Sequence, residues 1–488
     1  MATTIEATAE QGLNDVTLAK LEGVPLASFL ARQRWFSTKH DPRSAKLSEI
    51  VQLFPKYDAV FAQVDVKEQE GAASATYLLP IALVEKPQNE SSIIAKLSGS
   101  ELYLVDAAHD PGFRAALLDC LVHGYKFVSD GTQLRFNKHR EMDLPRDMPS
   151  KVASGEQSNT SIIYGDELIV KLFRKLTPGE NPDIEIGALL TERGSDVVPA
   201  LVGSATLDGD RGPTALAMAQ KLVPGARDLW AYVTDQLKGL STSEAALPFI
   251  AEAEELGRTT RTLHEALAGV TNQRAFTPAR ATHDDVVRWC SAIRREIQDS
   301  AALLRRTLLP TNDRDPGPSR EQLIAQGAAD IEHPDIILRD IAILENSQSL
   351  DAGLVIRHHG DYHLGQVLRD GGGKLYIIDF EGEPSRPLAE RRALHSPLRD
   401  VAGMLRSFAY AGSIAASHCA SSQTPLSWAD ALERSSLWER AARDAFMRGY
   451  LAVSSPTLPS DAETVERLVR LFAIEKAFYE LRYELAFR

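Results

Sequence analysis

The chain has 488 residues, of which 44% are hydrophobic and 25% are charged. This composition is that of an ordinary folded protein with room for two or three separate cores, and it excludes a disordered chain. The formal net charge of −13 argues against a nucleic acid as partner, because binding a phosphate-rich polymer usually needs a basic surface.

The cysteines and the apolar segments of the chain indicate the cellular compartment in which the protein is expected. Cys120, Cys290 and Cys419 are far apart, odd in number and without a CxxC pair, so neither a disulfide framework nor a zinc site is expected. Residues 1–11 lack the basic and apolar regions of a secretory signal, and no stretch has the roughly 18 consecutive apolar residues that a membrane span needs. We therefore expect a cytoplasmic protein with no membrane partner.

The first half of the chain is predicted to be rich in β-strands. Residues 50–104 contain short runs of alternating apolar and polar residues with turn residues between them. Residues 110–124 are predicted to form a helix, because their apolar residues recur at helical spacing. A second strand-rich stretch covers residues 151–223, with one helix expected near residues 183–194.

The character of the chain changes after Pro224, where amphipathic helical patterns dominate. Long helices are expected over residues 251–267, 283–309, 398–415 and 464–487. A β-rich front half followed by a helical back half predicts an α+β protein with two lobes and a cleft between them.

A short polar segment in the first half is a candidate for phosphate binding. Residues 154–160 lie between two predicted strands and consist of small or polar residues. Such residues at a hairpin tip can donate backbone N–H and hydroxyl hydrogen bonds to phosphate oxygens. We take Gln157, Ser158 and Asn159 as candidate nucleotide ligands, although a plain polar turn is the simpler interpretation of the segment taken alone.

The following strand, residues 168–173, carries a single lysine among apolar residues. A strand lysine that points into a cleft can bridge the α- and β-phosphates of ATP if a carboxylate fixes it. For Lys171, the expected partner is Glu185 on the next predicted helix, and Asp183 is the rival partner. The alternative is a lysine that only extends its ammonium from an edge strand into solvent.

The segment of residues 216–225 connects the strand-rich half to the helical half. In a two-lobed kinase, such a connector bonds the edge of the adenine through its backbone. The Lys221 carbonyl and the Val223 N–H are the candidates here, by position alone.

The most informative segment is residues 355–366, followed by the apolar strand of residues 375–381. Phosphoryl transfer needs a base beside the attacking hydroxyl and oxygen ligands for the metal ion that bridges the phosphates. Asp361 can be the base, and Gln366 and Asp379 can supply the oxygens that Mg²⁺ prefers. The spacing is that of kinases, with glutamine in place of the usual asparagine. It predicts ATP and Mg²⁺ as cofactors; an exposed loop beside an unremarkable strand is the alternative.

Three histidines in the same segment leave a second interpretation open. His358, His359 and His363 could form a metal site with Asp361, which would indicate a hydrolase. However, the sequence has no H-E-x-x-H helix, and the strand that ends in Asp-Phe would then have no role. We therefore expect His359 to orient the loop at the substrate site, and we count it as substrate-binding and His363 as catalytic.

Aromatic residues near the C-terminus suit a sugar. Lys476, Tyr479 and Tyr483 are spaced so that they project from one face of the predicted helix. Aromatic faces can stack on the C–H surfaces of a sugar ring, while the ammonium and phenol groups reach its hydroxyls. We take these three residues, together with Asp361, as substrate-binding; an aromatic stripe in the core is the alternative.

Six segments of the chain together resemble a known family. They are residues 32–36 (RQRWF), 155–161 (GEQSNTS), 181–185 (NPDIE), 359–366 (HGDYHLGQ), 396–404 (SPLRDVAGM) and 476–484 (KAFYELRYE). This set is similar to maltokinases, relatives of the aminoglycoside phosphotransferases with a protein-kinase-like fold. The first and last segments are the more specific to maltokinases, whereas the aspartate loop is shared with other sugar and antibiotic kinases.

The resemblance implies a bilobal protein-kinase-like fold in three parts. These are an N-terminal β-rich cap subdomain over residues 1–108, an intermediate subdomain that completes the nucleotide-binding N-lobe over residues 109–223, and a helical C-lobe over residues 224–488. The implied reaction converts ATP and maltose into ADP and maltose 1-phosphate, in the route from trehalose to α-glucan. By position, Asp400 resembles a buried support of the catalytic loop.

Alternatives to this activity stay open. Related kinases share the aspartate loop and the cap, so another sugar or an amino sugar such as glucosamine is the nearest alternative substrate. A non-catalytic pseudokinase that senses sugar is the alternative of a different class. Family members that are fused to trehalose synthase are longer than this chain, so any such association would involve a separate trehalose synthase.

Overall fold

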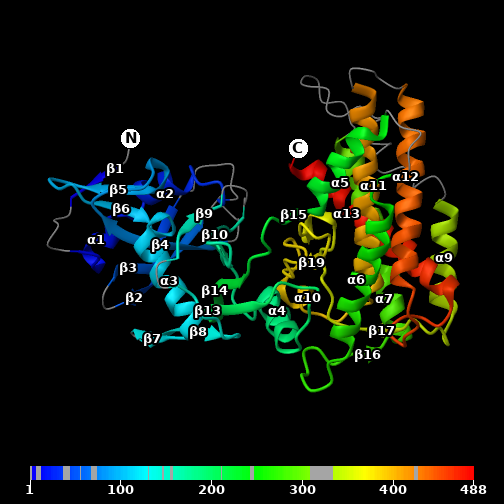
Figure 1. The fold of residues 1–488 in the computed structure, drawn as a ribbon, viewed down its shortest axis with the longest axis horizontal. Coiled ribbons are helices and arrows are strands. Elements are labelled where there is room, and N and C mark those ends of the chain that lie inside the picture. Colours follow the sequence, from blue (N-terminus) through cyan, green and yellow to red (C-terminus); the bar gives the residue numbers. More distant parts are fainter. Residues whose placement is uncertain are drawn as a thin grey trace. The chain divides into compact units, whose positions relative to one another are not determined.

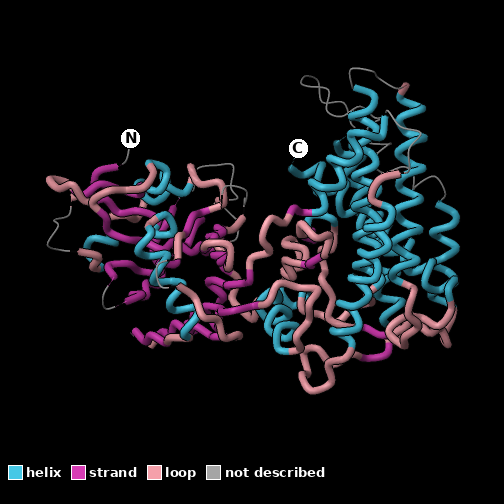
Figure 2. Tube along the Cα trace, in the orientation of Figure 1, coloured by secondary structure: helices cyan, strands magenta, loops and turns pink. Residues whose placement is uncertain are grey.

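The computed structural model of the protein forms two compact units, Met1–Pro224 and Gly225–Arg488 (Figure 1). It describes residues 3–6, 12–36, 44–54, 57–67, 74–129, 131–145, 148–153, 158–209, 211–241, 247–307, 334–421 and 427–487. Strands dominate the first unit and helices dominate the second (Figure 2), which confirms the predicted α+β class.

The N-terminal sheet of the first unit has the strand order β1-β5-β6-β4-β3-β2, with β12 paired to β4. Its strands are β1 (Thr3–Ile5), β2 (Ser44–Phe54), β3 (Tyr57–Lys67), β4 (Ala75–Val84), β5 (Ile93–Leu97), β6 (Tyr103–Asp106) and β12 (Lys175–Leu176). Two short helices, α1 (Asp15–Ala19) and α2 (Val24–Leu30), contribute to the apolar core of this sheet, and Trp35 and Phe36 are buried in the same core.

The second sheet of the first unit has the order β7-β8-β13-β14-β11-β10-β9, and all of its pairings are antiparallel. Its strands are β7 (Lys126–Ser129), β8 (Thr132–Lys138), β9 (Ser150–Val152), β10 (Thr160–Tyr164), β11 (Leu168–Leu172), β13 (Leu201–Gly209) and β14 (Gly212–Lys221). The two predicted helices are present as α3 (Pro111–His123) and α4 (Pro182–Glu192). Helix α3 begins where the Asp110 carboxylate caps the N–H of Phe113 and ends at Gly124, whose φ of 77° favours glycine.

A buried ion pair links the two sheets. The Arg174 side chain is fully buried, and its guanidinium lies 2.6 Å from the Asp106 carboxylate at the end of β6. It also donates to the hydroxyl of Thr160 and lies over the ring of Trp35. Because a buried charge is costly without partners, these contacts fix the end of β11 against the N-terminal sheet.

The second unit consists mainly of helices, with two small sheets beside them (Figure 1). The helices are α5 (Leu229–Leu237), α6 (Ile250–Ala268), α7 (His283–Thr307), α9 (Pro334–Asn346), α10 (Leu388–Arg391), α11 (Leu398–Ser421), α12 (Trp428–Tyr450) and α13 (Ala462–Phe487). Strands β15 (Arg227–Asp228), β18 (Val367–Arg369) and β19 (Leu375–Ile377) form one sheet, and β16 (Ala279–Arg280) pairs with β17 (Leu354–Val355).

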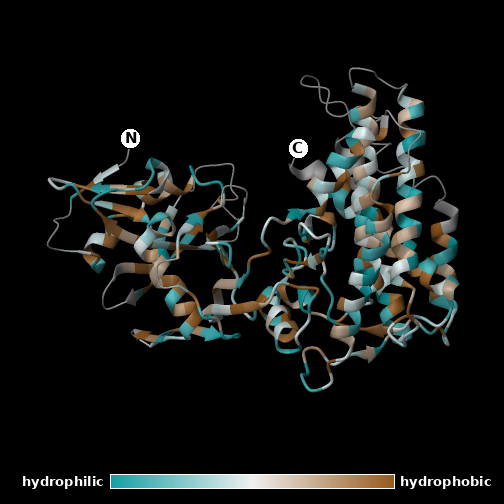
Figure 3. Ribbon diagram, viewed as in Figure 1, coloured by the Kyte–Doolittle hydropathy of each residue, from teal (hydrophilic) through white to brown (hydrophobic). Residues whose placement is uncertain are grey.

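Hydrophilic and hydrophobic residues alternate along the long helices, as expected of amphipathic helices (Figure 3). Helices α6 and α12 approach closely because glycines face the neighbouring backbone. A Cβ on Gly449 would lie 1.9 Å from the carbonyl oxygen of Glu254, and one on Gly257 would lie 2.1 Å from that of Phe446. A lipid bilayer could not be spanned by any helix in the described ranges, since none contains a long enough stretch of apolar residues.

Candidate active site

The predicted aspartate loop, residues 357–366, leaves β17 and returns to β18 through a single 3₁₀ turn, Leu364–Gln366. Gly360 within it has a φ of 84°, and a Cβ at this position would lie 3.3 Å from the Cα of Gly382. Only glycine adopts this conformation without strain. The loop therefore passes close to the segment after β19 and presents Asp361 just beyond the glycine.

Asp400, at the start of α11, anchors the backbone of the loop by hydrogen bonds. Its carboxylate accepts hydrogen bonds from the backbone N–H of His359 at 2.7 Å and of Gly360 at 2.9 Å, and it lies 3.1 Å from His264 Nε2. Burial raises the pKa of Asp400, but His358, His264 and His359 outweigh this effect and hold the pKa well below its ordinary value. This geometry suits the supporting role that the resemblance implies.

His359 has the contacts of a residue that orients the loop. It is 1% exposed; its Nε2 lies 2.9 Å from the carbonyl oxygen of Ile378, and its Nδ1 accepts from the Asp361 N–H at 3.4 Å. His358 is also buried, which lowers its pKa to about 4. Within the described ranges, no group of three potential metal ligands includes a histidine, so the alternative of a His-ligated metal site gains no support.

Gln366 and Asp379, the predicted metal ligands, are adjacent. Gln366 Nε2 donates to Asp379 Oδ2 at 2.9 Å, and the N–H of Ile378 donates to the carbonyl of Gln366 at 3.0 Å. Asp379 has a φ of 68°, a strained conformation that is uncommon outside glycine and is often found at functional positions. A carboxylate oxygen of Glu381, which sequence reasoning did not select, lies within 4.8 Å of one from Asp379.

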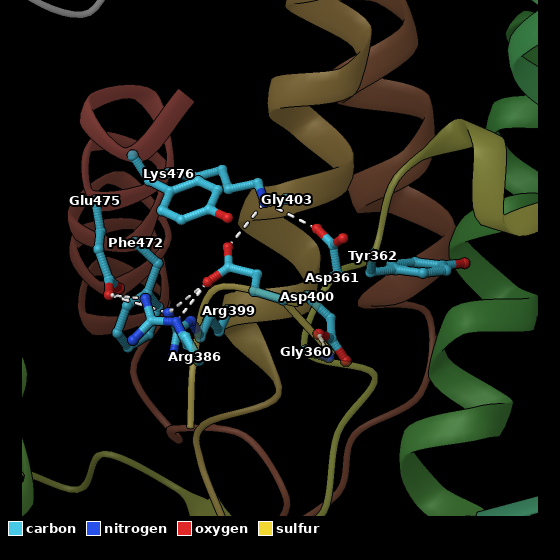
Figure 4. A pocket seen from close by; sticks show the side chains of 12 residues that line it. Gly360, Asp361, Tyr362, Arg386, Arg399, Asp400, Gly403, Phe472, Glu475 and Lys476 are labelled. Carbon is cyan, nitrogen blue, oxygen red and sulfur yellow. Dashed lines mark hydrogen bonds and ion pairs between the residues drawn. The ribbon is translucent and has the colours of Figure 1, made fainter. Parts of the chain in front are cut away.

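Lys476, on α13, reaches the predicted base. Its ammonium donates to Asp361 Oδ1 at 2.9 Å and to Glu383 Oε1 at 2.8 Å (Figure 4). Burial lowers the pKa of Lys476, but Asp361 and Glu383 outweigh burial and raise it above its ordinary value. The predicted substrate residue is therefore a charged partner of the predicted base.

A pocket at the aspartate loop is lined by residues that include Asp361, Glu383, Lys476 and Tyr479, and an ion-pair network forms part of its wall (Figure 4). The Glu475 carboxylate accepts from Arg386 and from Arg399 at 3.0 Å each, and Arg386 also donates to Glu383. Sequence reasoning missed these residues because Glu475 lies 76 positions from Arg399 and 89 from Arg386, although Glu383 and Arg386 are only three positions apart. The only local signal is the acidic run that follows Asp379.

Of the other residues predicted to bind the sugar, Tyr479 lines this pocket. The Tyr479 hydroxyl lies 2.9 Å from the hydroxyl of Ser385, and the ring lies 4.9 Å from the Lys476 ammonium. His363 accepts from the Gly365 N–H through Nδ1, and burial lowers its pKa. Tyr483 lies on α13, but its side chain is outside the described part of the structure.

In the first unit, Lys171 on β11 is paired with a carboxylate of α4. Its ammonium lies 3.3 Å from Asp183 Oδ2, so the rival partner of the sequence analysis has a direct contact with the lysine. Asn159 accepts from the N–H of Arg174 at 3.4 Å and donates to the hydroxyl of Ser158 at 3.5 Å. Gln157 lies outside the described residues.

Two further nucleotide candidates lie at the end of the second sheet. Lys221 is the last residue of β14, and its own N–H donates to the carbonyl of Ala200. Val223 follows two residues later. It stays a prediction that their backbone groups contact a nucleotide. The role of Glu185 in fixing the Lys171 ammonium also stays a prediction.

Comparison with known proteins bears on this site. Residues 29–110 match the maltokinase N-terminal cap domain. A glucosamine kinase of Streptacidiphilus jiangxiensis is 29% identical over 264 residues, which cover 53% of this chain and 54% of that enzyme. One of Mycolicibacterium smegmatis is 28% identical over 311 residues, 62% of this chain and 68% of that enzyme. The chain thus spans about half the length of the first of these relatives.

Solved structures of glucosamine kinase share the fold of the whole chain. One in complex with glucosamine, ADP and inorganic phosphate has a TM-score of 0.62 and 21% identity, and covers 94% of this chain and 95% of its own. Crystal form B has a TM-score of 0.65 and 21% identity, and covers 97% and 95%. The chain therefore carries a maltokinase N-terminal cap domain and has the kinase fold of these proteins, which confirms the predicted resemblance and fold class.

Proposed function

We propose that this chain is a sugar kinase, which transfers the γ-phosphate of ATP to a sugar hydroxyl held at Asp361. The observation that carries the proposal is the placement of Asp361 on a loop whose backbone is bound to the buried Asp400, with Lys476 against its carboxylate. A fixed carboxylate at the edge of a polar pocket is what a base for phosphoryl transfer requires. The glucosamine kinases that resemble the chain support the same class of reaction.

The reaction requires little covalent chemistry from the protein. The sugar hydroxyl donates a hydrogen bond to the Asp361 carboxylate and passes its proton to it as the oxygen attacks the γ-phosphorus. A new O–P bond forms, the bond between the γ-phosphorus and the bridging oxygen breaks, and ADP leaves. Burial favours the neutral form of His363, and because its Nδ1 accepts from the Gly365 N–H, its Nε2 carries the proton and can donate a hydrogen bond.

Gln366 and Asp379 fit a magnesium ion. The amide N–H of Gln366 donates to one oxygen of Asp379, so the amide group and the carboxylate are adjacent. Amide and carboxylate oxygens are both ligands that Mg²⁺ accepts. When bound, such an ion neutralises charge that develops on the phosphate oxygens. In the first unit, Lys171 would bind the α- and β-phosphates, with Asp183 fixing its ammonium.

Within this class, we propose maltose as the acceptor, with maltose 1-phosphate as the product. The maltokinase cap and the aromatic residue Tyr479 beside Lys476 support a neutral disaccharide. The pocket is lined by three cations and four carboxylates, and Lys476 already pairs with Asp361 and Glu383, so the ammonium of an amino sugar would compete with Lys476 for these carboxylates.

Glucosamine is the second candidate acceptor, because the relatives with similar sequences and structures are named for it. The two candidates are separated by the release of ADP with purified protein, ATP and Mg²⁺ in the presence of maltose, glucose, glucosamine or an aminoglycoside. Turnover of maltose at least tenfold above that of glucosamine is expected. Selective turnover of glucosamine would overturn the maltose assignment, and no turnover of any sugar would overturn the kinase itself.

A further inference from the structure

Glu383 lies in the segment after β19 and has no role in the reaction described so far. Its carboxylate is almost fully buried, and Oε1 accepts from the Lys476 ammonium at 2.8 Å. The same ammonium donates to Asp361 at 2.9 Å (Figure 4). Lys476 therefore bridges two carboxylates, of which only Asp361 is placed to take a proton from the acceptor.

We infer that Glu383 is a positioning residue, which anchors the Lys476 ammonium beside Asp361 and keeps it paired when an acceptor hydroxyl takes its place on Asp361. This inference rests on the proposed function for its consequence in catalysis. The anchoring itself is a property of the protein without substrate, so the two can fail separately.

The surroundings of Glu383 suit an anchor that stays charged. Arg386 donates to Oε2, and the guanidinium of Arg399 lies 3.8 Å from the same oxygen. Burial raises the pKa of Glu383, but Lys476, Arg386 and Arg399 outweigh burial and lower it to about 2. Glu383 is thus ionised over the whole range in which the protein would work, and it gives the ammonium a permanent partner.

The contact with Glu383 explains how the Lys476 ammonium can leave the Asp361 carboxylate. A lysine paired with Asp361 alone would lose its partner if the acceptor hydroxyl displaced it from Oδ1, and a buried ammonium without a partner is costly. With Glu383 in place, the ammonium keeps one carboxylate and can turn its other N–H groups towards sugar oxygens. Lysine has three donors, so both interactions can be made at once.

The kinetic test is Glu383→Gln, which removes the charge and keeps the shape. The charge-assisted bond to Lys476 is lost, so kcat with the sugar is expected to fall about ten- to hundredfold. The KM for ATP should change less than about twofold, because Glu383 contacts Lys476, Arg386 and Arg399, to which the proposed reaction gives no role in holding the phosphates. A kcat within threefold of wild type would overturn the inference.

A double-mutant cycle separates positioning from a general structural role. If Glu383 acts through Lys476, then Glu383→Gln should cost less than about threefold when it is added to Lys476→Met. An equal loss in both backgrounds would mean that Glu383 supports the pocket through Arg386 and Arg399, and would overturn the inference. Thermal unfolding of each variant checks that the fold is retained.

A readout without turnover keeps the test independent of the proposed function. Paired lysines react slowly with acylating reagents, so peptide mass spectrometry after brief acetylation should find Lys476 modified at least about fivefold faster in Glu383→Gln than in wild type. The matched control is Glu463→Gln, the same substitution on α13 at an exposed ion pair with Arg467, which should leave the rate unchanged. Equal rates in all three proteins would overturn the anchoring, whether or not the chain phosphorylates a sugar.

Discussion

The aspartate loop of the second unit and the lysine strand of the first unit are both stabilised by a buried carboxylate, but in different ways. Asp400 accepts hydrogen bonds from the backbone N–H groups of residues 359 and 360, so a change of side chain at either of those two positions leaves the N–H donor in place. Asp183 faces the side chain of Lys171, which one substitution does remove. The loop is thus fixed by its own backbone, and the lysine by a side-chain pair. The comparison predicts which substitutions affect catalysis, folding or nucleotide use.

The largest effect is expected at the tip of the loop. Asp361→Asn keeps the size of the side chain but cannot accept a proton, so kcat should fall about 10³-fold or more, while the affinity for ATP stays within about twofold. The release of ADP with the best acceptor measures kcat, and calorimetric titration with ATP measures the affinity for ATP. Turnover within tenfold of wild type would remove Asp361 from the role of base.

Beneath the loop, Asp400→Asn should lower the free energy of unfolding by about 3 kcal/mol at pH 7, because a buried charge and its hydrogen bonds are disturbed together. The folded-state pKa of Asp400 is lowered, so its stabilisation is complete at neutral pH and is lost as the pH falls below about 4. Urea unfolding of both proteins at pH 7, 5 and 3.5 should therefore show a difference that shrinks at the lowest pH. A constant difference would contradict this account.

In the first unit, Lys171→Met should lower kcat/KM for ATP about ten- to hundredfold, because a charge-assisted contact with the phosphates is lost. It should also destabilise the unit, since Asp183 is left buried without this partner. Adding Asp183→Asn should restore the stability but not the use of ATP. Recovery of both in the double variant would show that the lysine serves folding only. Lys175→Met, on the neighbouring exposed position of β12, is the control.

The sequence predicted some parts of this comparison better than others, for a physical reason. Asp361, Gln366 and Asp379 could be selected because a loop of fixed length and a following strand constrain their spacing locally. The helix of residues 110–124 could also be predicted from a local signal, the recurrence of its apolar residues at helical spacing. The partner of Lys171 could not be settled, because two carboxylates on one helix are two residues apart and only the orientation of that helix decides between them.

The network around Glu383 marks the limit of prediction from the sequence. Its members come from the segment after β19, from the start of α11 and from the middle of α13, and only the packing of these elements brings them together. Lys476 was selected for its place on an aromatic helix face, yet its contact with Asp361 spans 115 positions. Pairing between distant charges has no period in the sequence, so it becomes visible only in the fold.

The smallest effect is expected at Tyr479, whose hydroxyl bonds to Ser385 and whose ring lies 4.9 Å from the Lys476 ammonium. Tyr479→Ala removes the ring that would stack on the sugar and should raise the KM for the sugar about fivefold with little change in kcat, whereas Tyr479→Phe, which loses only the hydroxyl bonded to Ser385, should change it less than about twofold. Tyr410→Ala, at a partly exposed tyrosine that stacks on Trp230, is the matched control and should leave the KM unchanged. If Tyr479→Phe costs as much as Tyr479→Ala, the hydroxyl rather than the ring would be the group that recognises the sugar.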